Sequence, residues 1–282
     1  MSLPFDLFTP LLLAALGALL SERAGILNIA LEGQMLGGAF TAILVQQLTG
    51  NLALTALAVV SFGAATSLLL AWGTLKLKAD PFIAALGLNL LIPAVIGWVS
   101  FSLFGNQGVI RLNEAFSPQL GGVKLTFVAA LALAVVVHGV LFHTSWGLQL
   151  RASGTSEDLV ASRGLNSNRL KTTALVLSGV LGALGGAVLS LNLGAWVQGI
   201  SAGKGWIALV ALYLGLRRPL PLMAACLLLA WTQQASGFLQ GLPELPQGLL
   251  LGLPSLVTVV VFVITSATQR GRQRKSAKPI SR

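Results

Sequence analysis

Polar side chains that could contact a small solute are scarce in this sequence and lie within apolar runs. Glu32 is the acid most deeply embedded in apolar sequence, and it follows Asn28 by four residues, which places both on one helical face. Ionisable groups inside apolar spans often have functional roles, and amides offer hydrogen bonds without net charge. Glu32 has an alternative, structural role, as a cap for a broken helix or as a partner for Arg23. The residues that we select as candidate solute contacts are Asn28, Glu32, Gln34, Asn89 and Asn192.

The motifs of several enzyme classes are missing. Gly203 and Lys204 resemble the end of a phosphate-binding loop, but Gln198 stands where that loop needs its first glycine. Gly205 follows where a Ser or Thr should bind Mg²⁺. The sequence also contains no HExxH motif. We therefore expect no ATP hydrolysis and no other catalysis by this chain.

The sequence also has few residues that could bind a metal or form a disulfide. Cys226 is the only cysteine, so an internal disulfide and a CxxC metal site are excluded. His138 and His143 are five residues apart near the end of an apolar segment, and two histidines alone make a poor metal site. We expect no metal and no cofactor in this chain.

The composition indicates a polytopic membrane protein. Of the 282 residues, 55% are hydrophobic and 9% are charged, whereas soluble domains carry about 25% charged residues. The net charge of +10 does not indicate nucleic-acid binding, because the cations lie between or after apolar runs and form no basic domain. Nine apolar segments have membrane-crossing character, at residues 3–20, 24–48, 52–75, 82–104, 125–142, 173–193, 205–216, 220–239 and 249–266.

Lysine and arginine predict the orientation of these spans. An odd number of spans places the termini on opposite sides, and cytoplasmic connections carry the excess of positive charge. Fifteen of the 18 Lys and Arg residues fall in one set of connections, which includes residues 143–172 and the basic tail at 267–282. The opposite set contains only Arg111, Lys124 and Lys204. We therefore expect the N-terminus outside and the C-terminus in the cytoplasm.

Two polar, glycine-containing interruptions occur in comparable places, at 21–33 and 194–205. Each follows the first span of a group of four, and the predicted orientation places them toward opposite sides of the membrane. This pattern favours an all-α fold with an inverted 4+1+4 repeat, in which 125–142 is the linking span. Interrupted spans in corresponding positions of two halves are typical of transporters and indicate the solute path.

The sixth predicted span carries small residues at a spacing of four. Such a stripe leaves one face of a helix almost bare, so another helix can approach it closely. We expect this face to pack inside the protein, although the same pattern is compatible with a partner subunit. The stripe consists of Ser178, Gly182, Gly186 and Ser190.

The polar connection at 143–172 is predicted to hold a short helix in water. Thr155 and Asp158 have the spacing of a capping box, and Gly164 is a suitable left-handed C-cap. The helix should run from 156 or 157 to about Arg163. A helix of two turns is marginal alone in water, so it must pack on something. It either lies on its own loop or the membrane interface, or docks in a groove of a cytoplasmic partner.

Three separated motifs resemble ATP-binding-cassette importer permeases, and most closely the shorter of two paired subunits in the simple-sugar and nucleoside branch. The first motif is Ser-Glu-Arg-Ala-Gly at 21–25, followed by Asn-Ile at 28–29 and Leu-Glu-Gly at 31–33. The second comprises 147–152, 169–171 and 177–179, and the third is Gly-Lys-Gly-Trp-Ile-Ala-Leu at 203–209. Ala30, Gln34, Arg217 and Arg218 depart from the usual residues, which affects the substrate more than the fold.

The resemblance implies a permease domain at 1–266 in a bacterial plasma (inner) membrane, with 143–172 as its coupling loop. In that family the permease pair sits on two cytoplasmic ATPases, which bind the ATP and Mg²⁺, and an extracytoplasmic solute-binding protein delivers the solute. We expect membrane lipid and these proteins as partners, and no nucleic acid. The loop residues that we expect at the ATPase are Thr155, Asp158, Leu159, Val160, Arg163 and Gly164.

The expected function is ATP-driven import of nucleosides or related small polar solutes, by one half of a heterodimer. Simple sugars or branched-chain amino acids are alternative substrates within the same class. An ion-coupled secondary transporter is a rival from a different class. It would need an ion or proton site in the membrane, and Glu32 alone is a thin provision for one.

Overall fold

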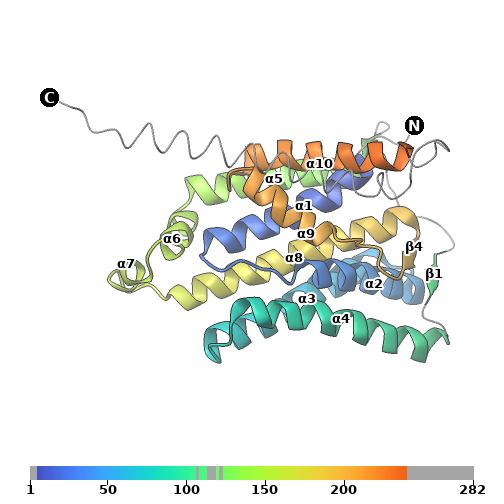
Figure 1. Ribbon diagram of the computed structural model, residues 1–282, viewed down its shortest axis with the longest axis horizontal. Coiled ribbons are helices and arrows are strands. Elements are labelled where there is room, and N and C mark those ends of the chain that lie inside the picture. The colour runs from blue at the N-terminus through green and yellow to red at the C-terminus, as the bar shows by residue number, and fades with distance from the viewer. Residues whose placement is uncertain (1–4, 106–107, 113–118, 121–122, 240–282) are drawn as a thin grey trace.

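The computed structural model describes residues 5–105, 108–112, 119–120 and 123–239, and nearly all regular structure in them is helical (Figure 1). This agrees with the all-α class expected from the sequence. A π-helical turn, η1 (Trp72–Lys76), extends α3. The α-helices are α1 (Phe5–Arg23), α2 (Leu31–Thr49), α3 (Leu52–Ala71), α4 (Pro81–Phe104), α5 (Leu125–His143), α6 (Ser145–Ser153), α7 (Glu157–Ala161), α8 (Ser167–Leu193), α9 (Lys204–Leu214) and α10 (Pro219–Leu239).

Four of the described helices have the length and composition of membrane spans. They correspond to the predicted segments 52–75, 82–104, 125–142 and 173–193. The predicted ninth span at 249–266 and the basic tail at 267–282 lie outside the described residues, so the count of nine stays a prediction. The four helices are Leu52–Lys76, Pro81–Phe104, Leu125–His143 and Ser167–Leu193.

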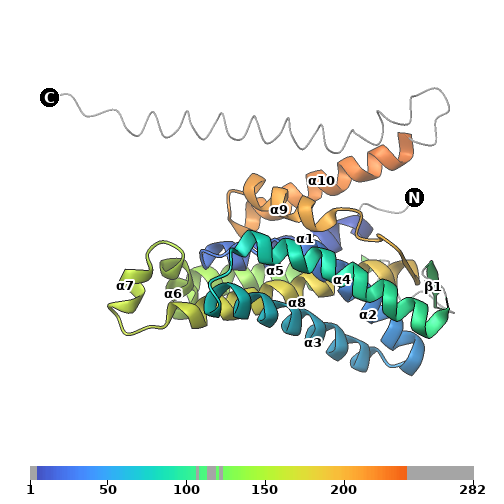
Figure 2. The same cartoon turned by 60° about the horizontal axis from the view of Figure 1, so that its bottom comes forward.

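Helix α8 forms the centre of the bundle and packs against α1, α2 and α3 (Figure 2). Its small residues allow this, because a Cβ added at Gly186 would overlap the carbonyl oxygen of Met35 in α2. A Cβ at Gly182 would lie 2.8 Å from a methyl carbon of Leu31. The hydroxyl of Ser190 donates to the carbonyl oxygen of Ala39 (3.0 Å). The prediction that this stripe packs inside the protein is confirmed.

The second predicted span, 24–48, is wrong in its first seven residues. Helix α1 ends at Arg23, and α2 begins only at Leu31. The chain turns at Gly25, whose φ of +80° is accessible to glycine, and the amide of Ile26 donates to the carbonyl oxygen of Ser21. Figure 1 shows the intervening chain running back toward the middle of the bundle before α2 starts.

The second interruption lies between α8 and α9. Gly194 ends α8 in the left-handed conformation (φ +68°), and Gly203 precedes α9 with φ +79°. Within this interruption, β4 (Ala195–Val197) pairs antiparallel with β1 (Val109–Arg111). A separate pair, β2 (Gln119–Leu120) and β3 (Val123–Lys124), lies before α5. Helix α9 then starts midway along the bundle (Figure 1).

Candidate solute path and coupling loop

Glu32 connects the two interruptions. It lies in the first turn of α2, and its carboxylate accepts hydrogen bonds from the Ser201 hydroxyl (2.6 Å), the Gly203 amide (2.9 Å) and the Gly205 amide (2.7 Å). These donors belong to the second interruption and to the first turn of α9. The amides at a helix N-terminus have no partners within the helix and favour negative charge. Glu32 therefore caps α9.

Gly205 is a point where the backbones of the two interruptions meet. A Cβ added there would lie 2.5 Å from the amide nitrogen of Glu32 and 2.6 Å from its Cα. Arg23 is not the partner of Glu32, since its guanidinium donates to the carbonyl oxygen of Arg217. Of the two structural interpretations of Glu32, the cap is thus correct and the pair with Arg23 is wrong. The cap belongs to the other interruption, far along the chain.

The amides of Asn28 and Gln34 join the first interruption to α3 and α8. Both side chains are fully buried. Asn28 Nδ2 donates to Gln34 Oε1 (2.8 Å) and to Ser178 Oγ (3.0 Å), and its Oδ1 accepts from the amide of Ala30 (3.1 Å). Gln34 Nε2 donates to Ser67 Oγ (3.0 Å). Asn28 thus pairs a non-helical backbone amide in an apolar bundle, where unpaired groups are costly, and Gln34 holds Asn28 in place.

Asn89 supports the same interruption from α4. Its Nδ2 donates to the carbonyl oxygen of Ile29 (2.9 Å), and its Oδ1 accepts from the amide of Gly33 (2.8 Å). Asn28, Gln34 and Asn89 therefore have structural partners that the sequence did not reveal. Their contact with a solute stays a prediction.

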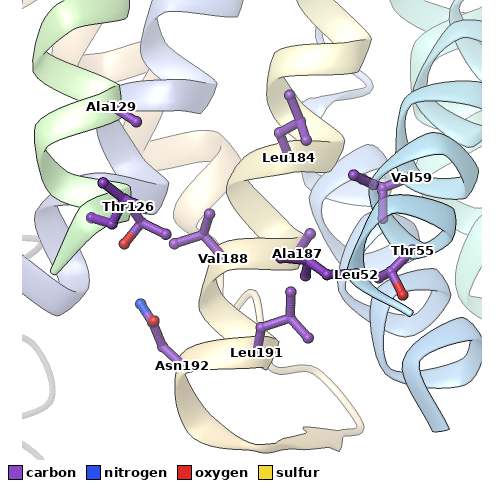
Figure 3. Close-up of a pocket in the computed structure, with 12 residues that line it drawn as sticks. Leu52, Thr55, Val59, Thr126, Ala129, Leu184, Ala187, Val188, Leu191 and Asn192 are labelled. Carbon is purple, nitrogen blue, oxygen red and sulfur yellow. The ribbon is translucent and has the colours of Figure 1, made fainter. Parts of the chain in front are cut away.

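Asn192 lies apart from that group, at a cavity of about 270 Å³ between α3, α5 and α8 (Figure 3). Asn192 Nδ2 and Thr126 Oγ1 are buried and have no hydrogen-bond partner among the described residues. Figure 3 shows both side chains on the same side of the cavity. The remaining lining is almost wholly apolar and includes Val59, Leu184 and Val188. A mostly apolar cavity with a few polar groups is the usual form of a small-molecule site.

Thr126 was not among the residues selected from the sequence. It is a single hydroxyl in the first turn of an apolar helix, and such a residue commonly bonds its own backbone. Only the packing of α5 beside α8 places it at the cavity with Asn192.

The polar connection contains two helices where the sequence predicted one. Helix α6 begins after Thr144, whose hydroxyl accepts from the amide of Gly147 (3.1 Å). Helix α7 begins at Glu157, so the cap position is residue 156 and the predicted capping box of Thr155 and Asp158 is one residue out of register. The Thr155 hydroxyl instead donates to the carbonyl oxygen of Arg151 (3.0 Å). Gly164 has the left-handed conformation expected of it (φ +71°).

Helix α7 is anchored to the bundle rather than free. Val160 is 1% exposed, so its side chain packs inward and the expectation that it contacts an ATPase is corrected. Glu157 forms an ion pair with Lys171 in the second turn of α8. Asp158 and Arg163 are exposed and remain candidates for contact with a partner, together with the exposed Thr155 and Gly164. The expectation for Leu159 stays a prediction.

These features define an all-helical, multi-pass membrane protein with an exposed helical loop between its apolar helices. A family model described as "Branched-chain amino acid transport system / permease component" matches residues 5–266. The chain therefore belongs to this permease family.

Curated relatives agree with this family. Nucleoside ABC transporter permease protein NupC of Lactococcus lactis subsp. cremoris is 31% identical over 91% of this chain and 88% of its own length. Guanosine ABC transporter permease protein NupQ of Bacillus subtilis is 29% identical over 90% of this chain and 87% of its own length. A putative glucose ABC transporter permease protein of Haloferax volcanii, TsgC13, is 30% identical over 75% of this chain and 68% of its own length. No solved structure matches the chain.

Proposed function

We propose that this chain is the permease subunit of an ATP-driven importer for nucleosides or related small polar solutes. ATP and Mg²⁺ would bind to a separate cytoplasmic ATPase, and a second permease subunit would complete the membrane unit. An extracytoplasmic solute-binding protein would deliver the solute. The observation that carries this proposal is the link from the exposed α7 to the central helix α8. Through this link, the part of the loop that is expected to contact the ATPase is joined to the helix that packs against α1, α2 and α3.

The link gives the loop a mechanical role. A partner that pushes on Asp158 or Arg163 would move α7, and the pair of Glu157 and Lys171 would pass that movement to the start of α8. Since α8 packs through glycines with backbone contact, it moves with its neighbours as a rigid unit. Alternating access in transporters proceeds by such rigid-body movements.

The packing also supports the proposed inverted repeat. The first helices of the two halves, α1 and α8, pack together, and each receives the third helix of the opposite half. Helix α2 packs on α3, as α9 packs on α10. Helices α2 and α9 both follow an interruption and run in opposite directions (Figure 1). This is the arrangement that a two-fold axis in the membrane plane produces.

The proposed solute is uncharged and hydrogen-bonding. Thr126 and Asn192 offer a hydroxyl and an amide without net charge, and the apolar walls of the cavity suit the faces of a nucleobase. A sugar would use the same polar groups, and the relative named for glucose supports it as the alternative substrate.

Crosslinking tests the coupling role directly. Arg163→Cys in a Cys226→Ser background should crosslink to the ATPase, whereas Leu48→Cys, 70% exposed in the last turn of α2, should not. Uptake into proteoliposomes should require ATP and the ATPase. Uptake by the purified chain alone, driven by an ion gradient, would overturn the proposal and establish a secondary transporter.

A further inference from the structure

A second cavity lies on the side of the bundle where the polar loop emerges. It has a volume of about 560 Å³ and is lined by His138 and Phe142 of α5 and by Arg218, Leu220 and Pro221 where α10 begins. Its walls are therefore apolar with one cationic side chain at the edge. Leu220 is 58% exposed, so the cavity continues onto an apolar surface. This composition differs from that of the cavity at Asn192, which has no charged lining residue.

Further arginines surround this cavity. The guanidinium of Arg151 lies 4.8 Å from the ring centroid of Phe142, and that of Arg23 lies 5.8 Å from it. Arg151, Arg217 and Arg218 all lie close enough to act on the charge of Arg23.

Only one carboxylate opposes these four arginines among the described groups that act on Arg23. It is Glu22, which pairs with Arg217 at 3.1 Å. Arg218 makes no ion pair within the part of the chain that the structure describes. The cluster therefore has a large positive excess at a place where like charges repel each other. An anion from outside the chain would reduce that repulsion.

His138 supplies an independent sign of a missing ligand. Its Nδ1 is buried and has no hydrogen-bond partner among the described residues, although it lies at the cavity wall. Buried polar atoms are nearly always hydrogen-bonded, so an unpaired one needs a partner from elsewhere. Imidazole and guanidinium together are suitable donors for phosphate oxygens.

We propose that this cavity binds an anionic phospholipid, with its phosphate at Arg218 and His138 and its acyl chain along Leu220 and Pro221. A free phosphate could bind to the same arginine and histidine. The apolar wall of the cavity, however, would be in contact only with a lipid. Basic pockets between membrane helices commonly bind anionic headgroups in this way. Occupancy would reduce the positive excess of the cluster that joins the ends of α1 and α5 to the turn before α10.

Native mass spectrometry of the purified, delipidated full chain tests the proposal. Dioleoyl phosphatidylglycerol should bind about tenfold more tightly than dioleoyl phosphatidylcholine, because the choline group of the latter would place another cation beside the arginines. Arg218→Ala should remove most of this preference and weaken phosphatidylcholine binding less than phosphatidylglycerol binding. Lys76→Ala, an exposed cation in η1 away from the cavity, is the matched control and should keep the preference.

Two further arms separate the lipid from other anions. Leu220→Trp fills the apolar side without altering charge and should also weaken phosphatidylglycerol binding. Soluble glycerol phosphate should compete only weakly with phosphatidylglycerol. If it competes at the same concentration as the lipid, the cavity is a site for a free anion and the lipid proposal is overturned. Equal binding by Arg218→Ala and Lys76→Ala would overturn the site. So would a loss of ATPase assembly in Arg218→Ala with unchanged lipid binding. If the Arg218→Ala variant aggregates, Arg218→Gln can be used in its place, because it removes the same charge.

Discussion

At the residue scale, Glu32 shows how one acid serves two distant parts of the chain. Its three hydrogen bonds all go to the segment 201–205, which is separated from it by about 170 positions in the sequence. Both carboxylate oxygens of Glu32 accept hydrogen bonds in this contact. Its principal role is therefore to hold the N-terminus of α9 against the first turn of α2.

Glu32→Gln should destabilise the protein, because the new amide group would place N–H donors against the N–H donors of α9. Hydrogen bonds to charged groups contribute about 1.5–3 kcal/mol, so we expect a loss of that size and a lower Tm. The measurement is thermal unfolding in detergent. Asp6→Asn is the control, since the Asp6–Lys124 pair is partly exposed and such pairs contribute about 0–1 kcal/mol. Equal shifts in both variants would contradict the capping role.

Thr126→Val and Asn192→Ala should separate binding from stability. Since Thr126 Oγ1 and Asn192 Nδ2 have no partner among the described residues, their removal leaves no internal group unpaired and the Tm should stay unchanged. The KM for the transported solute should rise about tenfold, the usual effect of one lost hydrogen bond to a bound ligand. Uptake kinetics in proteoliposomes measure this. A lower Tm with an unchanged KM would show that the two groups are structural.

At the scale of elements, the bundle depends on how closely α8 approaches its neighbours. Gly186→Ala would force the new Cβ into the backbone of α2 at Met35. Overpacking of this kind costs about 1–3 kcal/mol. Gly87→Ala in α4 is the matched control, because nothing lies within 4 Å of its Cβ position and alanine favours the helix by about 1 kcal/mol. In thermal unfolding, the Tm of Gly186→Ala should be lower than that of the wild type, and the Tm of Gly87→Ala should equal or exceed it.

The loop offers a charge-swap test of coupling. Glu157→Lys or Lys171→Glu alone should uncouple ATP hydrolysis from transport, because each places like charges beside each other at the joint of α7 and α8. The double variant restores opposite charges and should recover most of the coupling. The measured quantity is solute transported per ATP hydrolysed. If the double variant is no better than the single ones, the pair does not transmit movement.

At the scale of the whole molecule, the distribution of Lys and Arg predicts that the polar loop faces the cytoplasm. In a Cys226→Ser background, Arg163→Cys should react with a membrane-impermeant thiol reagent only from the cytoplasmic side. Leu48→Cys, exposed at the other end of the bundle, should react only from outside. Whole cells and inverted vesicles provide the two accessible faces. Labelling of Arg163→Cys in intact cells would invert the proposed topology and remove the cytoplasmic role of α7.

The sequence alone determined the class of protein, the polar loop and the places where two spans are interrupted. These properties depend on local composition, since a charged connection cannot lie in lipid and a glycine can begin or end a helix wherever it occurs. Local rules also placed Gly164 at the end of the loop helix. They were one residue wrong at its start, because Thr155 and the residue after it are both plausible caps.

Only the tertiary structure decided which groups meet. It paired Glu32 with Gly203 and Gly205, used Asn28 within the fold and brought Thr126 to the same cavity as Asn192. It also turned Val160 inward. A hydrogen bond or a packing contact between residues far apart in the sequence depends on how helices cross, and helix crossing depends on the shapes of both surfaces together. No single stretch of this chain carries that information.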